Sequence, residues 1–177
     1  MSEKPTDKPT CIVVMGVSGC GKSTLGEPLA RALDLEFVEG DSLHSQANID
    51  RMAAGIALTD ADRRDWLHAL AAQLARAGGG GGVVMTCSAL KRNYRDILRG
   101  GCPLLQLVHM HGSVELLAER MRNRPNHYMP ASLLQSQLDA LQMPTADERV
   151  LSLDIALPLD EQLALAVHHF QGQDPSA

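Results

Sequence analysis

The sequence predicts an α/β protein in which five parallel strands form one sheet with helices on both faces. Short apolar runs recur along the chain, and each is followed by residues with helical periodicity. None of these runs shows an alternating polar face, which is typical of strands buried on both sides of a parallel sheet. The expected strands span residues 11–15, 36–38, 83–87, 104–110 and 150–156.

The segments between the strands carry apolar side chains at the i, i+3, i+4 and i+7 spacing of one helix face. Two such stripes are Leu67, Leu70, Ala71 and Leu74, and Val114, Leu117, Ala118 and Met121. Thr59, with Asp62 three residues later, resembles a capping box at the start of the first of these helices. Pro28 removes a backbone hydrogen bond from the first helix, so we expect a kink or a loosened turn there.

Length and composition indicate a single globular domain. The chain has 177 residues, of which 45% are hydrophobic and 21% are charged. We expect one domain over residues 11–170, with flexible tails at 1–10 and 171–177. The glycine run 78–82 is expected to act as a flexible linker.

Charge and hydropathy exclude several classes of partner. The net charge of −5 disfavours nucleic-acid binding through a broad basic surface. No apolar run approaches the roughly 18 residues needed to span a bilayer, and residues 1–10 lack the apolar core of a signal peptide. We therefore expect a cytoplasmic protein with no membrane or nucleic-acid partner. The four cysteines are scattered without metal-ligand spacing, which favours reduced structural thiols.

A glycine-rich segment directly after the first expected strand matches the phosphate-binding pattern G-x-x-x-x-G-K-[ST]. Its glycines let backbone N–H groups point at phosphate oxygens, and the following helix adds its N-terminal dipole. We expect Lys22 to bridge the β- and γ-phosphates, Ser23 to bind Mg²⁺ and Thr24 to contact an α-phosphate oxygen. The expected nucleotide-binding residues are Gly16, Val17, Ser18, Gly19, Cys20, Gly21, Lys22, Ser23 and Thr24. A glycine-rich turn with an incidental lysine is the alternative.

A phosphate loop does not by itself separate kinases from GTPases, motors or regulators. Asp41 follows the second expected strand, at the edge where open α/β sheets bind ligands. Its carboxylate could accept the proton of an attacking hydroxyl or hold hydrated Mg²⁺, and it could also cap the following helix. His44, three residues later, is as consistent with packing or capping as with substrate contact.

Two groups of cations complete the candidate site. Lys91, Arg92 and Arg95 lie within one helical turn after the third strand and predict an anion pocket, with a solvated basic face as the alternative.

Arginines also recur at every second position before a proline-bounded loop, which predicts a lid over about residues 122–131. Closure of such a lid would bring guanidinium groups onto the transferring phosphoryl group and exclude water. A charged helix end that complements its dipole is the alternative.

Several strings in the chain together carry a resemblance to a known family. They are M-G-V-S-G-C-G-K-S-T, G-D-S-L-H, N-I-D-R-M-A-A-G-I-A-L-T-D-A-D-R-R-D-W-L, C-S-A-L-K-R-N-Y-R-D-I-L-R, H-Y-M-P-A-S-L-L-Q-S-Q and L-Q-M-P-T-A-D-E. In these strings the chain resembles the bacterial gluconate kinases (gluconokinases), from about residue 11 to residue 158. The resemblance implies a P-loop NTPase fold like that of nucleoside monophosphate and shikimate kinases, with a lid. It also implies ATP- and Mg²⁺-dependent phosphorylation of D-gluconate to 6-phospho-D-gluconate by a homodimer.

The resemblance further implies roles for individual residues. Arg120 would flank the adenine, with the turn near Pro158 on its other side, and Arg124 would reach the phosphates. Lys22, Asp41 and Arg124 are then the expected catalytic residues. The residues implied to grip the sugar acid are Asp41, His44, Arg51, Arg63, Lys91 and Arg95.

Two other functions remain open from the sequence. One is a shikimate-like or nucleoside-type small-molecule kinase with the same phosphate loop and a different acceptor pocket. The other is a regulatory module that binds nucleotide without transferring phosphate.

Overall fold

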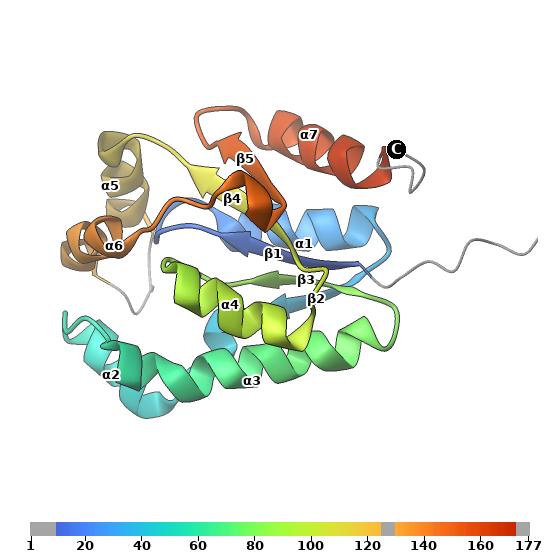
Figure 1. Cartoon of the computed structure of the whole chain (residues 1–177). Coiled ribbons are helices and arrows are strands. Elements are labelled where there is room, and N and C mark those ends of the chain that lie inside the picture. The colour runs from blue at the N-terminus through green and yellow to red at the C-terminus, as the bar shows by residue number, and fades with distance from the viewer. Residues whose placement is uncertain (1–9, 125–129, 173–177) are drawn as a thin grey trace, which may run out of the picture.

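The computed structural model describes residues 10–124 and 130–172 of the chain. Its five strands all pair in parallel, in the order β2, β3, β1, β4, β5 (Figure 1). The strands are β1 (Cys11–Met15), β2 (Glu36–Glu39), β3 (Val83–Thr86), β4 (Gln106–His111) and β5 (Val150–Asp154). The predicted α/β class and the predicted parallel sheet are therefore confirmed.

Helices cover both faces of this sheet (Figure 1). The longer helices are α1 (Lys22–Ala32), α3 (Asp60–Gly78), α4 (Arg92–Gly101) and α7 (Leu159–Gln171). The shorter ones are α2 (Gln46–Ala53), α5 (Val114–Arg122) and α6 (Leu134–Ala140), together with the 3-10 turns η1 (Gly40–Leu43), η2 (Ala131–Leu133) and η3 (Ala146–Glu148). Helices α3 and α4 pack on one face, and α1 and α7 pack on the other.

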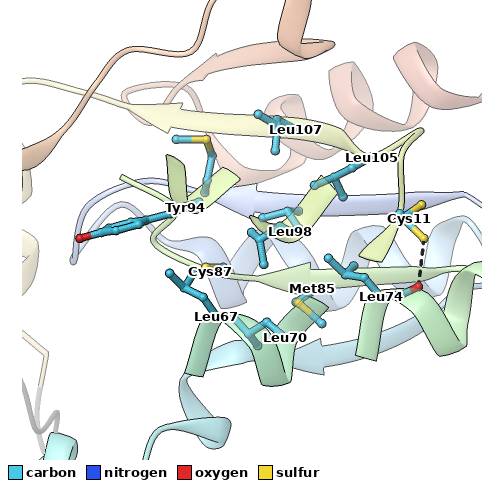
Figure 2. Close-up of a cluster of buried hydrophobic side chains, with 14 of the residues drawn as sticks. Cys11, Leu67, Leu70, Leu74, Met85, Cys87, Tyr94, Leu98, Leu105 and Leu107 are labelled. Carbon is cyan, nitrogen blue, oxygen red and sulfur yellow. Dashed lines mark hydrogen bonds between the residues drawn. The ribbon is translucent and has the colours of Figure 1, made fainter. Parts of the chain in front are cut away.

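The central strand β1 supplies both halves of the core. Its odd-numbered residues, such as Val13, face the cluster formed with α3 and α4, to which Leu70 of α3 and Leu98 of α4 both belong (Figure 2). Its even-numbered residues, Ile12 and Val14, join the cluster formed with α1 and α7. This alternation follows from the two-residue period of a strand. Both faces of β1 are therefore shielded from solvent, and polar residues follow only after the strand ends at Met15.

Local signals in the sequence set the helix boundaries in several places. The predicted capping box is present, because the Thr59 side chain accepts from the Asp62 N–H while the Asp62 carboxylate accepts from the Thr59 N–H. Ser45 caps α2 in the same way by accepting from the Asn48 N–H. Asp41 lies inside η1, so its alternative reading as the cap of the following helix is wrong. Helix α1 continues through Pro28 as far as Ala32.

The glycine run forms a hydrogen-bonded turn rather than a loose linker. Helix α3 extends to Gly78, and the N–H groups of Gly80 and Gly82 both donate to the carbonyl of Ala77. Gly82 has a φ of +92°, and a Cβ at this position would lie 2.6 Å from the Thr10 carbonyl oxygen. Only glycine fits both requirements, so this turn fixes how the chain enters β3.

Some expectations fall on parts of the chain that the structure does not describe. The expected tails 1–10 and 171–177 lie largely outside the described residues, and so do residues 125–129 of the expected lid 122–131. Among the helices of the described segments, none is long and apolar enough to cross a membrane. All four cysteines are buried free thiols.

Two buried histidines have pKa values well below the usual range of the imidazole group. His109 lies inside β4 at 1% exposure, and its Nδ1 has no hydrogen-bond partner within the described part of the chain. Burial lowers the pKa of His109 to about 4, and electrostatic interactions with His111 and Arg95 add to this effect. His44 is also buried, and burial lowers its pKa to about 4 despite the nearby Asp41 carboxylate. Both imidazoles are therefore neutral in the folded protein at neutral pH.

Replacing Gly82 by alanine should destabilise the protein by about 1–3 kcal/mol, because the new Cβ combines a positive φ with a backbone clash. Gly81→Ala is the matched control, since no atom lies within 4 Å of a Cβ built there. We expect Gly81→Ala to change the free energy of unfolding by less than about 0.5 kcal/mol. Urea titrations of the two variants measure this difference, and equal stabilities would contradict the structure of the turn.

Lowering the pH from about 6.5 to about 4 should reduce the free energy of unfolding, since the unfolded chain protonates His109 in this window and the folded chain does not. The expected slope is at most about 1.4 kcal/mol per pH unit for each such histidine. His109→Gln should make the slope shallower, whereas His68→Gln, on the exposed surface of α3, should leave it unchanged. Denaturant titrations between pH 7 and pH 4.5 test this, and identical slopes for parent and His109→Gln would refute it.

Candidate nucleotide and acceptor sites

The segment between β1 and α1 wraps into a tight loop at the carboxyl end of the sheet. Gly16 leaves the central strand with a φ of +149°, and a Cβ here would lie 2.6 Å from the Met110 carbonyl oxygen and 2.7 Å from the Cys20 sulfur. The loop thus packs directly against the end of β4, where no side chain fits. Helix α1 begins immediately afterwards at Lys22, so its N-terminal N–H groups border the loop.

The side chain of Lys22 lies over this loop. Its ammonium group donates to the carbonyl oxygens of Gly16 at 3.1 Å and of Val17 at 3.2 Å. Both acceptors are neutral, so an anionic phosphate oxygen would be a stronger partner for the same cation. The loop therefore holds one ammonium group beside several backbone donors, which is the arrangement expected of a phosphate site.

A carboxylate that the sequence reasoning did not single out joins this loop to the sheet. Glu39, the last residue of β2, accepts hydrogen bonds from the hydroxyls of Ser23 and Thr86 through its two oxygens. Thr86 pairs with Glu39 in the β2–β3 register, and its hydroxyl also accepts from the Gly40 N–H at 3.1 Å. The signal was present in the sequence, because Glu39 ends the same strand that precedes Asp41.

One cavity gathers most of the predicted nucleotide-binding residues. It has a volume of about 1010 Å³ and is lined by residues 18–24, by Glu39 and Asp41, and by Arg120, Arg124 and Pro158. The Arg120 guanidinium donates to the Ile155 carbonyl at 2.8 Å, which holds it near the turn before α7. Residues from separate parts of the chain thus converge on one space large enough for a nucleotide.

The oxygen ligands in this cavity suit Mg²⁺. Ser23, Glu39 and Asp41 all line this cavity and offer one hydroxyl and two carboxylates. Among the residues described by the structure, no group of three or more His, Cys, Asp or Glu side chains could hold a metal on its own. Mg²⁺ is typically bound by one or two protein oxygens together with water and substrate phosphates, and this set of donors fits that pattern.

A second, smaller cavity of about 480 Å³ lies between α3, α4 and α6. Its walls carry the charged and polar side chains of Thr59, Asp60, Arg63, Lys91, Tyr94, Ser136 and Gln137. Lys91 donates to the Asp60 carboxylate at 2.8 Å, and the Tyr94 hydroxyl donates to the same oxygen. These two hydrogen bonds lower the pKa of Asp60, so its carboxylate stays ionised near two cations. The cavity offers the mixture of cations and hydrogen-bonding groups that a polyhydroxy acid requires.

The structure does not bring Arg95 to either cavity. Its guanidinium is 1% exposed and binds the Glu148 carboxylate through Nε at 2.7 Å and Nη2 at 2.9 Å. Its Nη1 donates to the carbonyls of Ala89 and Leu90, in a turn where Ala89 has a φ of +46°. Burial would raise the pKa of Glu148, but the hydrogen bonds from Arg95 and Arg99 outweigh it and lower this pKa to about 2. The position of Arg95 is that of a residue that holds the turn before Lys91 in shape.

Three other residues of the expected site, Arg92, Arg51 and His44, also line neither cavity. Arg92 bonds to Asp96 and Asp147 rather than contributing to an anion pocket. Arg51 is partly exposed and lies 3.6 Å from the Asp62 carboxylate. His44 stacks on Trp66 with ring centroids 4.0 Å apart, and its Nδ1 has no hydrogen-bond partner among the described residues. Of the expected sugar-acid residues, Asp41 lines the larger cavity, and Arg63 and Lys91 line the smaller one.

The chain is similar in sequence to a family model and to proteins of known function. A family model described as an AAA domain matches residues 11–144. A gluconokinase from Gluconobacter oxydans (strain 621H) is 46% identical over 170 residues, and the alignment covers 94% of each chain. The chain belongs to the gluconokinase family. The resemblance expected from the sequence is thereby confirmed.

Solved structures agree with this membership of the gluconokinase family. A gluconokinase from Sinorhizobium meliloti 1021 superposes with a TM-score of 0.84 at 48% identity, covering 93% of each chain. A sugar kinase from Janibacter sp. HTCC2649 superposes with a TM-score of 0.88 at 45% identity, covering 92% of this chain and 95% of that chain. The P-loop kinase fold of the family is therefore the fold of this chain, and nucleotide use follows from it.

Proposed function

We propose that this member of the gluconokinase family transfers the γ-phosphoryl group of ATP to the 6-hydroxyl of D-gluconate. The observation that carries the proposal is the pairing of two cavities in a chain that aligns with a gluconokinase over 94% of its length. The larger cavity contains a phosphate loop with its lysine, and the smaller one contains two cations among hydroxyl groups. Together they match a nucleotide donor and an anionic polyol acceptor.

The larger cavity would bind and orient ATP. Backbone N–H groups of the loop and the Lys22 ammonium would surround the phosphates, where they oppose the charge of the transferring group. Arg124 would add a second cation at the phosphates, and Arg120 with Pro158 would hold the base at the far end of the cavity. Mg²⁺, held by the phosphates with Ser23 and Glu39 or Asp41 nearby, would neutralise further phosphate charge.

The smaller cavity would bind the sugar acid. Arg63 and Lys91 would pair with its carboxylate, while Thr59, Asp60 and Ser136 offer partners for hydroxyls along the carbon chain. Asp41 lines the nucleotide cavity together with the phosphate loop, and its carboxylate would accept the proton of the attacking hydroxyl. Phosphoryl transfer requires little covalent chemistry from the protein, so positioning of the two substrates is its main task.

The remaining features of the proposal rest on the resemblance and on composition. We propose a cytoplasmic homodimer that acts on a small molecule and has no membrane or nucleic-acid partner. The net charge of −5 supports the absence of nucleic-acid binding.

The function is tested by supplying purified protein with Mg²⁺, ATP and one acceptor at a time, and coupling ADP release to an optical signal. We expect turnover with D-gluconate and product identified as the 6-phosphate by NMR, with no comparable turnover of shikimate or nucleosides. Lys22→Met should lower kcat by about 10²–10³-fold, which shows that the activity belongs to this chain. Turnover of shikimate or a nucleoside without turnover of gluconate would overturn the substrate assignment, and ATP binding without any turnover would favour a regulatory module.

Arg63→Met should raise the KM for gluconate by about 10-fold or more, because a charge-assisted hydrogen bond to the carboxylate is lost. The KM for ATP should remain within about 2-fold, since Arg63 lines only the smaller of the two cavities. Arg64→Met is the matched control, because Arg64 is the exposed neighbour on α3 and lines neither cavity. Steady-state kinetics decide the matter, and an equal effect of both variants would move the acceptor site elsewhere.

A further inference from the structure

A single side chain connects the walls of the two cavities. Gln137, on α6, is 5% exposed, and its Oε1 accepts a hydrogen bond from the Ser18 N–H at 2.7 Å. Its Nε2 lies 3.5 Å from the Ser18 hydroxyl oxygen. Gln137 lines the smaller cavity, whereas Ser18 lines the larger one. The two residues are 119 positions apart in the chain, so the contact is a feature of the fold and not of local sequence.

The segment that carries Gln137 is also fixed to the loop on the other side of the smaller cavity. The N–H of Gln142, just after α6, donates to the Leu90 carbonyl at 2.8 Å. The Gln142 side-chain oxygen accepts from the Arg92 N–H at 2.7 Å. Lys91 lies between these two anchor points. A ligand held by Lys91 and by α6 would therefore contact a segment that is also hydrogen-bonded to the phosphate loop through Gln137.

The Ser18 N–H matters because it belongs to the loop whose backbone donors form the phosphate site. A strong hydrogen bond to a buried glutamine oxygen fixes the direction of that peptide group, and leaving a buried amide without an acceptor is costly. Any shift of α6 must therefore move the peptide group of Ser18 or break its bond. Ordering of α6 by an acceptor would, conversely, hold the loop in the shape that receives phosphate.

We propose that Gln137 is a positioning residue that couples the acceptor cavity to the phosphate loop, so that gluconate and ATP each tighten the binding of the other. The inference rests on the proposed function, because it takes the smaller cavity as the gluconate site. Thermodynamic linkage requires the same factor in both directions, and coupling of this kind typically amounts to about 5-fold or more. Gln137 itself need not touch either reacting atom.

Isothermal titration calorimetry tests the coupling with a non-hydrolysable ATP analogue and Mg²⁺, with and without saturating gluconate. For the parent protein we expect gluconate to lower the Kd of the analogue by about 5-fold or more. Gln137→Met keeps the length of the side chain and removes the acceptor, so the ratio of the two Kd values should fall to about 1. Gln137→Glu keeps an acceptor oxygen and should retain most of the ratio, even where its charge weakens absolute affinity. Gln135→Met, on the exposed side of the same helix, should behave like the parent.

The outcomes separate this inference from the proposed function. Absence of gluconate turnover by the parent would overturn the proposed function, and the inference with it. Turnover with a Kd ratio of 1 in the parent, or an unchanged ratio in Gln137→Met, would overturn the inference alone. Should Gln137→Met fail to fold, hydrogen exchange on the parent decides: gluconate alone should slow exchange of the Ser18 amide several-fold, and an unchanged rate would refute the coupling.

Discussion

The burial of the central strand β1 on both faces determines where polar side chains can lie in this protein. Every residue of β1 is at most 1% exposed, since helices cover both faces of the sheet around it. Burying an unpaired polar side chain in such a strand costs free energy, and all five side chains of β1 are apolar, so the polar groups of this region follow its carboxyl end. There the chain turns at Gly16 against the Met110 carbonyl, and the phosphate loop takes its shape from that close approach. Strand β3, which pairs with β1, and strand β2, which pairs with β3, end at the same edge of the sheet, with Glu39 at the end of β2 and Asp41 and Lys91 after the two strands.

Much of this arrangement could be predicted from the sequence because it depends on local patterns. The apolar runs, the Thr59–Asp62 capping box and the phosphate loop each lie within a short stretch, where residue type and spacing determine the structure. Glu39 was missed because the second strand was ended one residue too early. With the strand extended to Glu39, the rule that highlighted Asp41 would have highlighted both carboxylates.

Contacts between distant parts of the chain could not be predicted in the same way. Lys91, Arg92 and Arg95 look alike in sequence, but the partner of Arg95 is Glu148, 53 residues later. No residue close to Arg95 in the sequence indicates that Glu148 is its partner. The sequence pattern therefore predicts an anion pocket that includes Arg95, whereas the structure places Arg95 in a buried ion pair. A buried charge needs a partner of opposite sign, and removing either member is strongly destabilising. Through its hydrogen bonds to the carbonyls of Ala89 and Leu90, Arg95 of this pair supports the turn that precedes Lys91.

The hydrogen bonds from Lys22 to the carbonyls of Gly16 and Val17 favour anionic ligands over neutral ones. The Lys22 ammonium group is partly buried and already lies over the loop that matches the phosphate-binding pattern. When a triphosphate binds, Lys22 would exchange its two neutral carbonyl acceptors for anionic phosphate oxygens, and its side chain would need to move little. The exchange makes the loop selective for anionic ligands, because a neutral ligand would offer Lys22 no stronger hydrogen-bond acceptor than the two backbone carbonyls it already has.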